Sequence, residues 1–189
     1  MFKSVNNKTR AILVGVFILV AYGILASLIT QSKLIVMIFD MISGLAVIGI
    51  SVLMFPLFKS LNKSISLSYL LLKYLEGILM IIGGIVFLFD STQAIRDTIY
   101  NGIHLYIFIA SAFLFYYLLY KSELVPKFIS VWGALGILAL LISTMTKLFN
   151  IHHPVVDYFL VLIITNEIFL AIWLMVKGFN KSKVSKHQV

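Results

Sequence analysis

The chain has 189 residues, of which 61% are hydrophobic and only 12% are charged. A soluble domain is about half apolar and about a quarter charged, so this composition is typical of a membrane protein and leaves no stretch for a separate soluble domain. The lack of cysteine excludes disulfides, thiolate metal sites and a cysteine nucleophile. The net charge of +8 comes from residues at the ends of apolar runs, which indicates contact with the lipid bilayer and not with nucleic acid.

Six apolar segments follow one another along the chain. They cover residues 11–30, 34–58, 65–89, 102–120, 128–149 and 155–176. At about 1.5 Å per residue, each can cross most or all of the bilayer core as a helix, and none shows the period-two alternation of a barrel strand. We therefore predict an all-α fold in which residues 1–179 form a single six-helix transmembrane bundle and residues 180–189 form a basic cytoplasmic tail.

Positive residues flank these segments unequally. If the N-terminus is inside, the outer connections hold only Lys33, Arg96 and Lys147, whereas eleven Lys and Arg residues lie on the inner side. This bias predicts that both termini are cytoplasmic. The outer connection 90–101 has the length and composition of a short helical turn in the membrane interface.

Three charged residues lie near the middle of the predicted spans. Lys73 and Glu76 share one face of the third segment, and Glu167 lies midway along the sixth. Counting turns places Glu76 and Glu167 near the membrane midplane, with Lys73 one turn closer to the cytoplasm. We expect these three residues and Asn166 to form an inner polar cluster.

Two further ionisable residues, Asp40 and His104, fall in the outer part of the membrane and are expected to form an outer pair. Two ligands do not make a metal site, so no metal is predicted. The sequence also lacks a phosphate-binding loop and a nucleophile motif, and it indicates no cofactor.

Charges at membrane depth tend to be paired, buried in protein or functional because an isolated charge there is costly. If Lys73, Glu76 and Glu167 approach within about 4 to 6 Å, one carboxylate has no cation of its own and can carry a proton. The cluster can then fix the helix register, bind a ligand or ion, or take part in catalysis.

Several stretches resemble an uncharacterised bacterial integral membrane family, domain of unknown function 4386. They are Asp40 with FPLFKSLNKS (55–64), LLKYLEG (71–77), YLLYKSELVPKFISVWG (117–133) and NEIFLAIWLMVKG (166–178). The resemblance implies a multi-pass protein of the bacterial inner membrane and points to Asp40, Lys73, Glu76, Glu167, Trp173 and Lys177. The sequence departs from the family pattern at Lys73, where arginine is usual, so a point charge replaces a two-pronged donor.

The leading interpretation is a non-enzymatic integral membrane protein whose polar cluster organises the bundle and forms a small ligand cavity. One alternative is a small proton-coupled transporter or ligand-binding membrane protein, and a second is an intramembrane enzyme that modifies lipid. Self-association into a homo-oligomer, or pairing with another membrane protein, is compatible with each of them.

Overall fold

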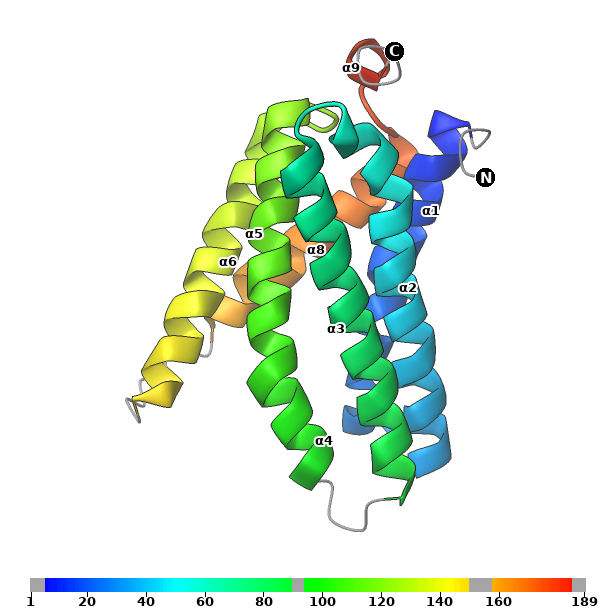
Figure 1. The fold of residues 1–189 in the computed structure, drawn as a ribbon, viewed down its shortest axis with the longest axis vertical. Helices are drawn as coiled ribbons and strands as arrows, with labels where there is room; N and C mark the ends of the chain where they lie inside the picture. The colour runs from blue at the N-terminus through cyan, green and yellow to red at the C-terminus, as the bar shows by residue number, and fades with distance from the viewer. Residues whose placement is uncertain (1–5, 90–93, 150–157, 185–189) are drawn as a thin grey trace.

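The computed structural model describes residues 6–89, 94–149 and 158–184, which form a bundle of helices with no strand among them (Figure 1). The long helices are α1 (Asn7–Ala21), α2 (Lys33–Lys59), α3 (Lys63–Phe89), α5 (Leu105–Ser122), α6 (Lys127–Leu148) and α8 (Phe159–Val176). Shorter elements are η2 (Tyr22–Leu28), α4 (Ala94–Ile99), η3 (Tyr100–His104) and α9 (Lys181–Val184). Six membrane crossings therefore follow, as the sequence predicts.

Two of the crossings are composite. The first continues from α1 into η2, a more tightly wound 3₁₀ segment, and together they cover Asn7–Leu28. The fourth covers Ala94–Ser122, because α4 and α5 are joined through η3, a loosely wound π turn with a kink at Gly102. Five crossings are long and apolar enough to span a bilayer, and the sixth is the shorter apolar helix at Leu160–Val176.

The fourth crossing extends one prediction. The connection 90–101 is predicted to hold a short helical turn at the membrane interface, and the part of it that the structure describes, 94–101, is helical and continues directly into the fourth span as α4 and the start of η3. The polar composition of this stretch suggests a connection, but Arg96 and Tyr100 both have partners inside the bundle. Arg96 is consequently buried and is not a loop residue.

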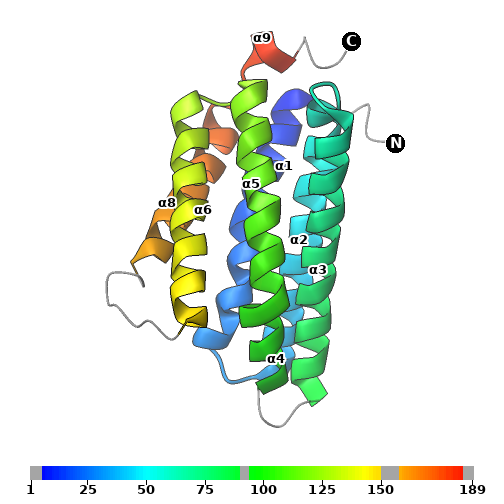
Figure 2. The same ribbon diagram turned by 60° about the vertical axis from the view of Figure 1, so that its left-hand side comes forward.

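The start of α1 and the short helix α9 lie at the same end of the bundle, next to the α2–α3 and α5–α6 connections (Figures 1 and 2). This agrees with an even number of crossings. That this end faces the cytoplasm remains a prediction from the charge bias.

Neighbouring helices approach closely where small residues face one another. The α2–α3 contact is the most extensive in the molecule, and at its centre a Cβ on Gly44 or Gly77 would lie 2.5 Å from the carbonyl oxygen of the other glycine. Without a hydrophobic driving force between helices in lipid, such close backbone packing supplies much of the attraction. These two glycines therefore fix the spacing of α2 and α3.

Apolar side chains occupy both the inside and the outside of the bundle. Leu45, Leu71 and Ile142 are more than half exposed on the outer surface, as expected for side chains that face lipid. Inside, Phe58, Tyr69 and Phe115 pack with ring centroids 5.6–6.1 Å apart and fill the half of the core nearest the termini. The remaining interior near the membrane centre holds the polar residues of the candidate site.

Candidate functional site

Lys73 and Glu76 form a buried ion pair on α3, as their spacing predicts. The Lys73 ammonium lies 3.0 Å from Oε1 and 2.9 Å from Oε2 of Glu76, and the two side chains are 9% and 3% exposed. The ammonium also lies 5.2 Å from the centroid of the Phe108 ring. Because both partners belong to one helix, this pair neutralises α3 itself and does not connect it to a neighbour.

The connection from α3 to α5 comes instead from Ser111. Its hydroxyl donates to Glu76 Oε2 at 2.7 Å, and the serine is fully buried. The Glu76 carboxylate thus accepts hydrogen bonds from a charged donor on its own helix and a neutral donor on the next. A buried carboxylate held in this way is well satisfied without any ligand.

Glu167 is positioned differently from the expectation. It does not join the Lys73–Glu76 pair; its Oε2 accepts a hydrogen bond from the Tyr22 hydroxyl at 2.7 Å, which connects α8 to η2. Among the described residues, no lysine or arginine lies within ion-pair distance of Glu167. The predicted inner cluster therefore consists of one closed ion pair and one carboxylate that has only a neutral donor.

Asn166 is also separate from the two carboxylates. Its amide nitrogen donates to the backbone carbonyl of Ile129 on α6 at 2.9 Å, and the residue is fully buried. Consecutive residues on a helix point about 100° apart, so Asn166 faces α6 while Glu167 faces the bundle interior. Asn166 fastens α8 to α6 and is not a ligand of the cluster.

The expected outer pair of Asp40 and His104 is wrong, because Asp40 binds Arg96. Arg96 Nε lies 3.0 Å from Oδ2 and its Nη2 lies 3.0 Å from Oδ1 of Asp40, a two-pronged contact between α2 and α4. The same guanidinium donates to Ser27 Oγ and to the Ile24 carbonyl of η2, both at 3.2 Å. These contacts form an outer clamp that joins three elements.

Aromatic rings complete the clamp. The Arg96 guanidinium carbon lies 4.5 Å from the Tyr100 ring centroid and 5.4 Å from that of Phe87. With both carboxylate oxygens and both rings engaged, the pair has the geometry of a structural lock.

A small cavity lies beside the two glutamates. It has a volume of about 180 Å³ and lies among η2, α3, α5 and α8. Its wall is apolar except for Tyr22, Glu76, His104 and Glu167. His104 packs edge-on against Tyr100 with the centroids 5.2 Å apart, and within the described part of the chain its buried Nε2 has no hydrogen-bond partner.

A second chamber, of about 60 Å³, adjoins the first toward the terminal end of the bundle. Glu76 and Glu167 line both chambers, and Tyr69 and Lys73 line only the second. The two carboxylates therefore stand where the chambers meet.

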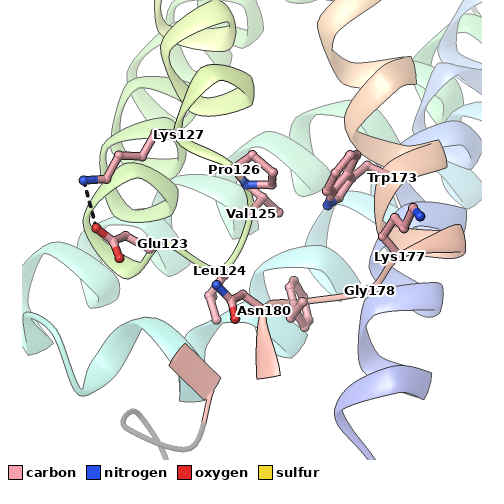
Figure 3. A pocket seen from close by; sticks show the side chains of 10 residues that line it. Glu123, Leu124, Val125, Pro126, Lys127, Trp173, Lys177, Gly178 and Asn180 are labelled. Carbon is pink, nitrogen blue, oxygen red and sulfur yellow. Dashed lines mark ion pairs between the residues drawn. The ribbon is translucent and has the colours of Figure 1, made fainter. Parts of the chain in front are cut away.

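Trp173 and Lys177, the two last residues that the family resemblance indicates, lie elsewhere. They line a pocket of about 430 Å³ at the terminal end, between the α5–α6 connection and the chain that leaves α8 (Figure 3). On the opposite side of this terminal pocket, Glu123 Oε1 binds the Lys127 ammonium at 2.8 Å, and Glu123 also pairs with Lys183. These two ammonium groups lower the pKa of Glu123 to about 2.

Sequence reasoning missed three partners: Tyr22, Arg96 and Ser111. Tyr22 is an ordinary hydroxyl residue in an apolar span. Ser111 shares a helix face with His104, seven residues earlier, but that alignment does not identify Glu76 as its partner. Arg96 offered a clearer signal, since it is an arginine within a turn or so of a span and Asp40 otherwise has no cation at its depth.

A protein-family model described as a domain of unknown function (DUF4386) matches residues 9–100 and residues 88–178. No curated protein and no solved structure matches the chain. Together the two matched ranges extend over all six crossings, which confirms the family that the short motifs suggest. The chain is a multi-pass membrane protein that belongs to the DUF4386 family.

Proposed function

We propose that this protein is a non-enzymatic integral membrane protein that binds a small amphipathic ammonium cation in the cavity beside Glu167. The observation that carries the proposal is the charge balance around the two central glutamates. Lys73 and Glu76 neutralise each other, whereas among the residues that the structure describes Glu167 has only the neutral Tyr22 hydroxyl as a partner. An isolated carboxylate at membrane depth is costly, so a bound proton or a bound cation completes the site.

The cavity suits a ligand with a small apolar body. Its volume of about 180 Å³ equals that of about six water molecules at liquid density, which is below the size of a drug-like ligand. Most of the wall consists of side chains such as Leu25, Ile163 and Ile164. A short alkyl group fits such a wall, and the ammonium head would meet the carboxylate.

The outer half of the bilayer offers an entry route. Leu25 on η2 and Leu160 on α8 both line the cavity, and they are 42% and 47% exposed on the outer surface of the bundle. η2 packs mainly against α2, while α8 packs against α1 and α6, so the η2–α8 seam is held chiefly by the Tyr22–Glu167 hydrogen bond. A ligand dissolved in lipid could enter through this seam.

Binding would exchange the cation for a proton. When Glu167 carries a proton, the incoming ammonium forms an ion pair with the carboxylate and one proton leaves, so the charge of the site is conserved. This exchange is also the elementary step of proton-coupled transport. The position of both carboxylates between two chambers favours such transport as a second candidate function.

Calorimetric titration of the purified protein in detergent tests the proposal with a matched pair of probes, hexylammonium and the neutral hexanol. We expect hexylammonium to bind the parent chain at least tenfold more tightly than hexanol, with proton release in buffers of different ionisation heat. Glu167→Gln should abolish this preference and leave hexanol binding unchanged. Equal affinity of both probes, or a preference that survives in Glu167→Gln, would refute the proposal.

Transport requires a separate measurement. Proteoliposomes with an imposed pH gradient should accumulate butyltrimethylammonium, which cannot cross lipid as a neutral amine. Uptake that depends on Glu167 would support a transporter. Binding without uptake would leave a ligand-binding membrane protein.

A further inference from the structure

The terminal pocket is a second candidate site, independent of the glutamates at the membrane centre. It has a volume of about 430 Å³ and is formed by two segments that are far apart in the sequence, 123–127 and 173–180 (Figure 3). The larger volume and the position at the end of the bundle distinguish it from the interior cavity.

The floor of the terminal pocket is fixed by the backbone. Helix α8 ends at Val176, and Gly178 adopts a positive φ of 72°, which turns the chain back toward the bundle. Phe179 then inserts into the core with 6% exposure, and the backbone N–H of Asn180 donates to the backbone carbonyl of Leu124 at 2.8 Å. The two segments are therefore joined and hold the pocket open between them.

The pocket carries an excess of positive charge. Lys127 and Lys177 line it, and Lys183 is drawn to its edge by Glu123. Glu123 is the acidic residue in the wall, and its two oxygens are already bound to Lys127 and Lys183. Lys177 is exposed at the rim and makes no ion pair with the residues that the structure describes.

An indole and an apolar wall complete the site. Trp173 lies in the last turn of α8, where tryptophan marks the level of lipid headgroups, and its ring nitrogen is directed toward the α5–α6 connection (Figure 3). Leu124, Val125 and Pro126 form the opposite wall. A ligand in the pocket would meet the indole N–H and these apolar contacts. Lys127 and Lys177 extend from opposite sides of the pocket, away from each other, and their flexible side chains would turn inward to reach a bound anion (Figure 3).

We propose that the terminal pocket binds the phosphate of an acidic phospholipid headgroup. Lysines bind phosphate as point charges, and the Trp173 N–H supplies a neutral donor. The depth at the end of α8 places the pocket at the level of lipid phosphates, with its apolar wall next to the glycerol backbone. The proposal does not depend on the function of the interior cavity.

The test uses the full chain in phosphatidylcholine nanodiscs that contain increasing fractions of phosphatidylglycerol. In a Trp132→Phe background, Trp173 is the sole tryptophan, and its emission reports on the pocket. We expect phosphatidylglycerol to change this emission and native mass spectrometry to show its retention over phosphatidylcholine. Each lysine near a membrane surface contributes about fivefold in affinity, so Lys127→Gln with Lys177→Gln should lower retention about 25-fold.

Two controls separate a built pocket from diffuse attraction. Lys63→Gln with Lys121→Gln removes the same charge at the same end of the bundle, outside the pocket, and should leave retention nearly unchanged. Trp173→Phe should weaken retention without changing any charge. An equal loss in both lysine pairs, no preference for phosphatidylglycerol, or an emission change produced equally by inorganic phosphate would each overturn the proposal.

Discussion

Removing one charged residue of the outer clamp is expected to destabilise the protein strongly, and removing both together is expected to restore part of that loss. Arg96→Met removes the guanidinium and leaves the Asp40 carboxylate, 0% exposed, without a cation. Breaking one partner of a buried ion pair costs about 3–5 kcal/mol. Asp40→Leu leaves the buried Arg96 guanidinium without an anion and should lower the free energy of unfolding by a similar amount.

The double variant Asp40→Leu with Arg96→Met removes both charges together. What remains lost are the two hydrogen bonds from Arg96 to Ser27 and Ile24, at about 1 kcal/mol each. The double variant should therefore be destabilised by about 2 kcal/mol, less than either single variant. With about 2–4 °C per kcal/mol for a chain of this size, Tm should fall by about 6–20 °C in the singles and about 4–8 °C in the double.

Thermal unfolding in a mild detergent, followed by circular dichroism, measures all three variants. Arg96→Lys serves as the matched control, because it keeps the charge, loses the two-pronged geometry and should fall between the parent and Arg96→Met. If the double variant were destabilised by the sum of the two single effects, Asp40 and Arg96 would not be coupled, and the ion pair would not be the source of the loss.

Three further predictions follow from other contacts. Ser111→Ala should lower the free energy of unfolding by about 0.6–1.7 kcal/mol, the range for hydrogen bonds between membrane helices, and an unchanged Tm would contradict its bond to Glu76. Because the pKa of Glu123 is lowered from 4.5 to about 2, its contribution to holding α9 should be complete above pH 4.5 and lost as the pH falls toward 2. A spin label at Ser182→Cys should therefore gain mobility only in that acidic range, whereas gain near neutral pH would show that Glu123 does not hold α9. In intact cells, an impermeant thiol reagent should label Gln31→Cys and not Ser60→Cys, and the reverse pattern would invert the predicted orientation.

The sequence predicts the class and the number of crossings because lipid imposes strong rules on composition. In lipid, an apolar segment that lacks barrel periodicity satisfies its backbone N–H and C=O groups by forming a helix. About 20 apolar residues are needed for each crossing. The Lys73–Glu76 contact was predictable for a similar reason, since residues three apart on one helix are neighbours whatever the rest of the fold does.

Contacts between helices depend on rotations that no local pattern specifies. Glu76 and Glu167 lie at similar predicted depths, yet Glu167 bonds to Tyr22 because α8 presents it toward η2. Asp40 and His104 also share a depth, but α4 adds turns to the fourth crossing and brings Arg96 to Asp40 first. The depth of a residue in the membrane follows from counting residues along one helix. Which side chains pair between helices depends on how the two helices are rotated relative to each other.

The two interior ion pairs can form at different times while the chain is synthesised at the membrane. Lys73 and Glu76 are made almost together on α3 and can neutralise each other as soon as that helix winds. Asp40 and Arg96 are separated by 56 residues. At about 5–20 residues per second, a ribosome needs about 3–11 s to make the arginine after the aspartate. During that interval the second helix carries a carboxylate with no cation, so its release into lipid before the fourth helix arrives is the step at which assembly is most exposed to failure.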